Sequence, residues 1–180
     1  MPDDRKLFTF TQWVLHAGVI VTMVLIGLYA LGVAAMIFAL MTSRLPLDWI
    51  AHWIGVTLTA DEIGRMALAA LVGAITVLAL VHFILRALRR VVASASVGDP
   101  FVEANAAELV RVAWLLLCVE VIDALFKPMI YLLAPDAMRA NIHHTFNISI
   151  TGLFAVLLIF VLAQVFRRGS EMRAELAGTI

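Results

Sequence analysis

Four apolar stretches, each long enough to cross a lipid bilayer, recur along this sequence. They are predicted at residues 11–40, 65–86, 108–133 and 145–166. About 20 apolar residues in a helix cross the hydrocarbon core. In lipid, only a helix or a closed barrel satisfies its own backbone polar groups. We therefore expect an all-α integral membrane protein, with residues 1–180 forming one domain built as a bundle of four transmembrane helices.

The composition agrees with a membrane protein. Hydrophobic residues make up 63% of the chain and charged residues 14%, whereas soluble domains have about 25% charged residues. The formal net charge is zero, so direct binding to nucleic acid is not expected. The one cysteine, Cys118, excludes an intrachain disulfide and a multi-cysteine metal site. The partner that the composition predicts is the lipid bilayer.

Positive charge is distributed unequally between the two ends of the predicted helices. One set of ends carries Arg5, Lys6, Arg86, Arg89, Arg90, Arg111, Arg167, Arg168 and Arg173. The opposite ends carry Arg44, Arg65 and Arg139. Arginine and lysine are retained on the cytoplasmic side of a membrane. We therefore expect both termini to be cytoplasmic, in a bacterial cytoplasmic (inner) membrane.

The connections between the helices carry local signals. Within 47–56, Trp49 and Trp53 lie four residues apart, which predicts a short interfacial helix between the first and second spans. Thr59 and Glu62 have capping-box spacing and predict the start of the second helix. Asp99-Pro100 predicts the start of the third helix, with Pro100 at its first position.

The third predicted span contains a stripe of polar residues, which we call the polar stripe: Glu120, Asp123, Lys127 and Tyr131. Helical spacing places them on one face. Ionisable groups are costly inside a membrane and mark functional sites by default, so the stripe predicts a ligand pocket, a proton path or a two-state switch. The alternative is a structural Asp123–Lys127 pair, with Lys127 reaching the headgroups. Asn147 and Thr151, at the start of the fourth span, are candidate supporting polar residues.

Two histidines suggest a redox alternative. His16 and His82 lie at similar depth in the first two spans, as axial ligands of haem b between two helices would. No second pair of histidines is placed to match. No HExxH, CxxC, GxSxG or phosphate-loop motif is present. We therefore expect no enzyme activity, no catalytic residue, no metal site and no cofactor, with haem as the alternative.

Two segments resemble a known bacterial family. The first is Gly98-Asp99-Pro100-Phe101 followed by Asn105, Leu109 and Arg111, and the second is Val165-Phe166-Arg167-Arg168-Gly169 followed by Glu175 and Thr179-Ile180. Together they resemble domain of unknown function 2975, a family of small membrane proteins with four predicted helices. The resemblance implies a cytoplasmic partner, because members often occur beside a small helix-turn-helix regulator.

These observations favour a non-enzymatic signalling or regulatory membrane protein that controls a helix-turn-helix regulator. The predicted partner surface consists of Gly98, Asp99, Pro100, Phe101, Asn105, Arg111, Arg167, Arg168 and Gly169. One alternative is a redox subunit that binds haem or quinone. Another is a small transporter or an accessory subunit of a membrane complex, in which a homo-oligomer could supply a polar path that one copy lacks.

Overall fold

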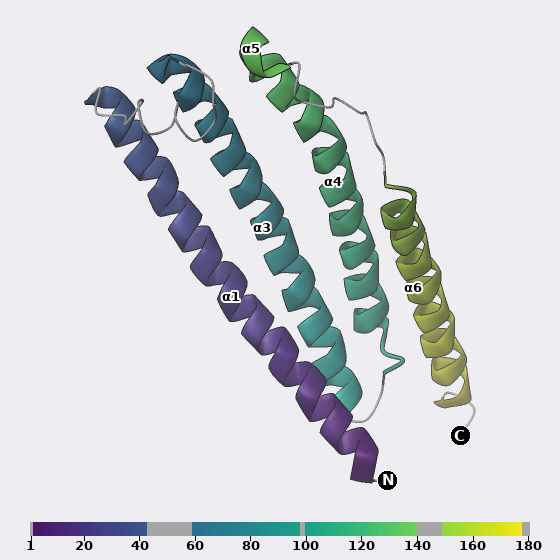
Figure 1. Ribbon diagram of the computed structural model, residues 1–180. Helices are drawn as coiled ribbons and strands as arrows, with labels where there is room; N and C mark the ends of the chain where they lie inside the picture. Colours follow the sequence, from purple (N-terminus) through teal and green to yellow (C-terminus); the bar gives the residue numbers. More distant parts are fainter. Residues whose placement is uncertain (1, 43–58, 98–99, 140–148, 178–180) are drawn as a thin grey trace. The chain divides into compact units, whose positions relative to one another are not determined.

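The described residues form four long α-helices and one short one (Figure 1). The computed structural model describes residues 2–42, 59–97, 100–139 and 149–177. Within these residues every regular element is a helix. The helices are α1 (Pro2–Met41), α3 (Ala60–Val97), α4 (Glu103–Leu133), the single turn α5 (Asp136–Arg139) and α6 (Ile150–Ala177). The four long helices predicted from the apolar stretches are thus confirmed, whereas the interfacial helix predicted at 47–56 lies outside the described residues.

Two helix starts are fixed by side chains. At α3, the backbone N–H of Thr59 donates to Glu62 Oε2 over 2.8 Å, and the N–H of Glu62 donates to Thr59 Oγ1 over 3.3 Å. This is the predicted capping box. At α6, the N–H of Gly152 donates to Ser149 Oγ over 2.9 Å. These bonds satisfy N–H groups that a helix start leaves without an intrahelical partner.

The start of the third helix, predicted at Pro100, was wrong by a few residues. α4 begins at Glu103 and not at Pro100, because the carbonyl of Pro100 instead accepts a bond from Asn105 Nδ2. α6 is described from Ile150, where Ser149 provides its cap, and residues 145–148 of the fourth predicted span lie outside the described residues. The helices also extend past their predicted ends into polar flanks, as α3 does to Val97. Hydropathy detects the lipid-facing part of a helix and not its full length.

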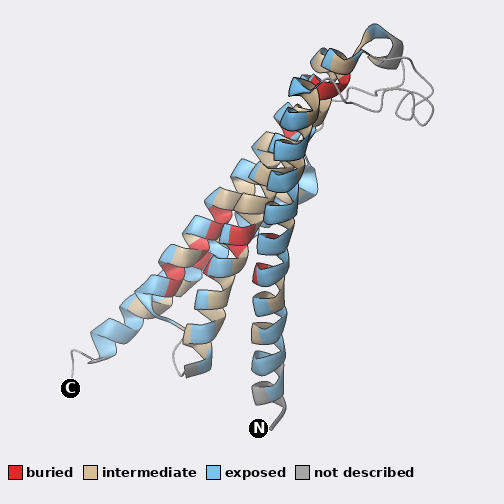
Figure 2. Ribbon diagram, turned by 90° about the vertical axis from the view of Figure 1, so that its left-hand side faces the viewer, coloured by how far each residue is buried: buried red, intermediate tan, exposed pale blue. Residues whose placement is uncertain are grey.

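Among the described residues, three helices are long and apolar enough to cross a membrane: Phe8–Met41, Ala60–Ser96 and Ile150–Leu176. Many of their apolar side chains are exposed, and most of the helix that starts at the N-terminus is coloured as exposed in the ribbon of Figure 2. Apolar surface of this extent requires a lipid or protein environment. α4 is of similar length, but Glu120, Asp123 and Lys127 interrupt its apolar sequence.

The chain divides into two compact units. Unit 1 consists of Met1–Met23, Ala79–Glu120 and Ile148–Ile180. Its core is Ile84, Ala87 and Val112, against which Leu88, Leu115, Leu116, Val119 and Ile159 pack. Trp114 of α4 meets Phe160 of α6 edge to face, with ring centroids 5.6 Å apart. Unit 1 therefore has a core to which α3, α4 and α6 all contribute.

Unit 2 consists of Val24–Leu78 and Val121–Asn147. Its helices approach one another at glycines. A side chain at Gly64 would overlap Leu40 of α1, and one at Gly73 would overlap the ring of Phe126 of α4. Gly64 and Gly73 are thus positions of close helix packing.

Candidate functional site

The polar stripe of α4 is divided between the two units. Glu120 is the last residue of its segment of unit 1, whereas Asp123, Lys127 and Tyr131 lie in unit 2. Lys127 Nζ donates to Asp123 Oδ2 over 2.7 Å, the i,i+4 pair expected from the sequence. The two side chains are 47% and 55% exposed, respectively. The two charges therefore pair with each other on the exposed surface of α4, and neither side chain points into the core formed by the described residues.

Glu120 occupies a different environment. Its carboxyl group lies against Gly152 of α6, in the space that a Cβ atom at residue 152 would fill. Only glycine permits this close approach. Glu120 is half-buried and contacts a neighbouring helix, so its contacts depend on how α4 and α6 pack in unit 1.

The remaining members of the predicted polar site are dispersed. Tyr131 lies beneath Arg139, whose guanidinium carbon is 5.8 Å from the ring centroid, and the Tyr131 carbonyl accepts a bond from Arg139 Nε over 3.4 Å. Thr151 is exposed near the start of α6. Asn147 lies outside the described residues. The outer polar cluster predicted around Asn147 therefore stays a prediction.

The two segments that carry the family resemblance meet in unit 1. Phe101 precedes α4, and its ring centroid lies 5.3 Å from that of Phe166 in α6. Phe101 also lies against Gly169, where an added Cβ would approach its Cδ1 to 2.6 Å. Residues more than 60 positions apart in the chain thus pack against each other. Phe101 of the first resembling segment is therefore in contact with Phe166 and Gly169 of the second.

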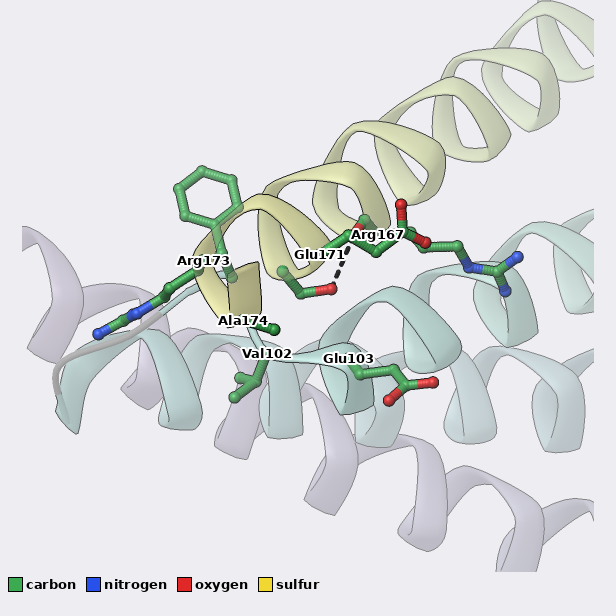
Figure 3. Close-up of a pocket in the computed structure, with 8 residues that line it drawn as sticks. Val102, Glu103, Arg167, Glu171, Arg173 and Ala174 are labelled. Atoms are coloured by element: carbon green, nitrogen blue, oxygen red, sulfur yellow. Dashed lines mark hydrogen bonds between the residues drawn. The ribbon is translucent and has the colours of Figure 1, made fainter. Parts of the chain in front are cut away.

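Beside this contact lies an open groove of about 730 Å³, which we call the α4–α6 groove. It is lined by Phe101, Val102, Glu103, Arg167, Ser170, Glu171, Arg173 and Ala174. Figure 3 shows Val102 and Ala174 between the two helices, with Arg167 and Arg173 extending to opposite sides. The groove therefore has an apolar centre and both signs of charge around it, which suits a peptide or protein surface.

Asn105 anchors the approach to this groove. Its side chain is almost fully buried, and Nδ2 donates to Ser94 Oγ and, over 2.9 Å, to the carbonyl of Pro100. One amide thus ties the end of α3 to the turn before α4. Asn105, a predicted residue of the partner surface, is itself buried. Through its bond to the Pro100 carbonyl it positions the adjacent Phe101. Gly98 and Asp99 lie outside the described residues.

A second charged cluster joins α3 to α4. Glu108 accepts two bonds from Arg90, over 3.0 and 2.8 Å, and one from Arg111 over 2.9 Å. The two bonds from Arg90 form the bidentate pair that arginine makes with a carboxylate. Arg111, predicted as part of the partner surface, instead lies in this cluster. Arg168 is exposed on α6 and is not among the residues that line the groove.

The two candidate haem ligands make different hydrogen bonds. Thr22 Oγ1 lies 3.0 Å from the carbonyls of Gly18 and Val19 and 3.0 Å from His82 Nδ1. The hydroxyl donates to a carbonyl and accepts from His82 Nδ1–H, which leaves a lone pair on His82 Nε2. A metal-ligating histidine shows this arrangement.

His16 lacks that arrangement. Arg89 Nη1 lies 3.0 Å from His16 Nδ1, and arginine can only donate. The neutral ring of His16 then carries its proton on Nε2 and has no lone pair there for iron. The two histidines therefore differ in their hydrogen-bond partners, and haem binding by the pair stays a prediction. Among the described residues, no group of three His, Cys, Asp or Glu side chains could hold a metal ion.

Several contacts had no sequence signal strong enough to identify them. Thr22 and Arg89 became relevant only through their histidine partners. Phe166 was part of a matched segment, but its contact with Phe101 was not predicted. Glu108 and Arg111 do have i,i+3 spacing, which is a recognisable helix-surface pair.

One comparison with known proteins gave a match. The model of the family described as "Protein of unknown function (DUF2975)" matches residues 43–180. No curated protein and no solved structure matches the chain. The matched residues include α3, α4 and α6 and both halves of the α4–α6 groove.

Proposed function

This chain belongs to the DUF2975 family, and from that premise we propose that it is a non-enzymatic, multi-pass membrane protein that regulates a cytoplasmic helix-turn-helix protein. The observation that carries the proposal is the contact of Phe101 with Phe166 and Gly169. It joins the two resembling segments into one surface. A regulatory partner needs such a surface outside the lipid.

The proposed topology has four transmembrane helices, namely the three apolar helices α1, α3 and α6 together with α4. Both termini are cytoplasmic. Excess arginine at one set of helix ends supports this orientation. Those arginines are Arg86, Arg89, Arg90, Arg111, Arg167 and Arg168. The α4–α6 groove, at the same ends of α4 and α6, then faces the cytoplasm of a bacterial cell. The lipid bilayer covers the exposed apolar faces of the helices.

In the proposed mechanism, α4 connects the polar stripe to the groove. Glu120 lies against α6 at Gly152, and the groove lies where the same two helices meet at Phe101. A proton, a ligand or a change in the membrane that alters the stripe would shift the packing of α4 on α6. That shift would open or close the groove. The partner would be bound or released accordingly.

The test uses the full-length chain co-produced with a fluorescently labelled small helix-turn-helix regulator of the kind that the family resemblance implies. We expect the regulator to be at the membrane with the unmodified chain and in the cytoplasm with Phe101→Ala. Trp114→Ala is the matched control, because Trp114 also stacks on an α6 phenylalanine but does not line the groove. A regulator that stays cytoplasmic with the unmodified chain would contradict the proposal.

The switch is tested by changing the polar stripe and leaving the α4–α6 groove unchanged. Asp123→Asn combined with Lys127→Met removes the ion pair without adding charge. We expect this variant to change the share of the regulator held at the membrane and, with it, expression from the regulator's target promoter. Unchanged membrane retention and unchanged expression together would remove the switch and leave only a docking function.

A second candidate function is that of an accessory subunit in a larger membrane complex. The half-exposed Asp123–Lys127 pair favours it, because ionisable groups in a membrane normally face protein or water. Another chain covering this face of α4 would provide protein. Purification in mild detergent distinguishes the two functions: a larger membrane complex would favour the accessory subunit, and the soluble regulator would favour the first proposal.

A further inference from the structure

We propose that a pocket between α3 and α4 in unit 1 binds the phosphate group of an anionic phospholipid. The pocket has a volume of about 400 Å³ and is lined by Phe83, Arg86, Arg90, Arg111 and Leu115. We call it the arginine pocket. It is separate from the α4–α6 groove, shares none of its lining residues, and does not depend on the proposed regulator.

The lining changes from apolar to cationic along both helices. On α3, Phe83 comes one turn before Arg86 and two turns before Arg90. On α4, which runs the other way along the bundle, Leu115 comes one turn after Arg111. The apolar residues are therefore on the membrane side and the arginines on the headgroup side. A phospholipid has the same order of acyl chain and phosphate.

The charges in the pocket leave positive charge for a ligand. Arg90 and Arg111 both bond to Glu108, which holds their guanidinium groups in place. Arg86 makes no ion pair within the described part of the chain and is exposed. Three arginines against one carboxylate leave a net charge of two positive units. Guanidinium groups bind phosphate through two parallel N–H bonds, which makes phosphate the ligand group of choice here.

The position of the pocket favours a lipid over a free phosphate compound as the source of that group. Phe83 is 54% exposed beside the arginines, so an acyl chain can lie against it. Basic pockets between membrane helices at headgroup depth are suited to anionic lipids. A soluble phosphate would leave this apolar wall uncovered.

The test compares lipid binding to the purified full-length protein by native mass spectrometry. Phosphatidylglycerol is the anionic probe and phosphatidylcholine the neutral one. We expect the unmodified chain to prefer phosphatidylglycerol and Arg86→Gln to lower that preference about fivefold, the effect of one arginine near an anionic membrane. Arg168→Gln removes the same charge from an exposed position outside the pocket, and we expect it to keep the preference.

A variant that is expected to raise the affinity distinguishes a specific change in the pocket from misfolding. Glu108→Gln removes the carboxylate that competes for Arg90 and Arg111, so we expect it to bind phosphatidylglycerol several-fold more tightly. A misfolded protein would not gain affinity. Equal losses in Arg86→Gln and Arg168→Gln would overturn the proposal in favour of general surface charge. Displacement of the lipid by millimolar glycerol phosphate would overturn the lipid as ligand and indicate a soluble phosphate compound.

Discussion

Units 1 and 2 hold α1, α3 and α4 together by different kinds of contact. Unit 1 contains all three of the buried polar side chains in the described chain, Thr22, His82 and Asn105, and each bonds outside its own helix. In unit 2 the ion pairs among the described residues join positions three or four apart: Asp61–Arg65, Asp123–Lys127 and Asp136–Arg139. Its helices instead meet where glycine faces a large apolar side chain.

The two kinds of contact determine different features of helix packing. A hydrogen bond between helices has a preferred distance and direction, and therefore fixes how each helix is rotated. A glycine allows two helices to approach but accepts a range of rotations. We therefore expect the polar contacts of unit 1 to fix how the helices are rotated and the glycine contacts of unit 2 to determine how closely they approach. Four substitutions test this comparison, from the largest expected effect to the smallest.

The largest effect is expected at the glycine packing of unit 2. Gly73→Leu places a side chain where the ring of Phe126 lies, and overpacking of this kind costs about 3 kcal/mol. Thermal unfolding in detergent measures the loss. Gly27→Leu is the control, because nothing lies within 4 Å of a Cβ atom at that position. Equal melting temperatures for the two variants would show that close packing at Gly73 does not hold unit 2 together.

The next effect is expected at Asn105 in unit 1. Asn105→Ala removes both bonds of a buried amide and leaves the carbonyl of Pro100 without this donor, at a cost of about 2 kcal/mol. Hydrogen exchange should rise in the residues joining α3 to α4. Thr76→Ala in unit 2 provides the reference, because this exposed side chain bonds to a carbonyl of its own helix. Exchange that rises as much in unit 2 as in unit 1 would contradict two separately stabilised units.

A smaller effect is expected from the bond between α1 and α3. Thr22→Val keeps the shape of the side chain but removes the acceptor of His82 Nδ1–H, and we expect a loss of about 1 kcal/mol. A double-mutant cycle with His82→Phe measures the coupling between the two residues. Additive losses would mean that this bond does not fix the rotation of α1.

The smallest effect is expected for an ion pair of unit 2. Arg65 and Asp61 are 3.2 Å apart, with side chains 58% and 80% exposed. Asp61→Asn should lower stability by at most about 0.5 kcal/mol, since water screens exposed pairs. Unfolding in detergent provides the measurement. A loss as large as that of Asn105→Ala would remove the distinction between pairing within one helix and bonding between helices.

The sequence was informative where a feature depends on neighbouring residues. Apolar runs predicted the four long helices, and the Thr59–Glu62 spacing predicted a cap that the structure contains. Charge spacing likewise predicted the Asp123–Lys127 pair. These features follow from helix geometry alone.

Contacts between helices could not be predicted in the same way. The Phe101–Phe166 contact requires the relative register and rotation of α4 and α6, which neither segment specifies alone. The same holds for the partners of His16 and His82, which share a similar depth in the sequence yet bond to Arg89 and Thr22. The start of α4 was misplaced because the Pro100 carbonyl bonds to a side chain five residues later.

The length of α1 has a consequence for the membrane around it. Its candidate span, Phe8–Met41, has 34 residues, or about 51 Å of helix, against a hydrocarbon thickness of about 30 Å. A helix with this hydrophobic mismatch must tilt strongly, thicken the bilayer around it or leave apolar turns in the headgroup layer. Each of these carries a free-energy cost that falls as the bilayer thickens. The chain is therefore expected to sort into thicker regions of a membrane.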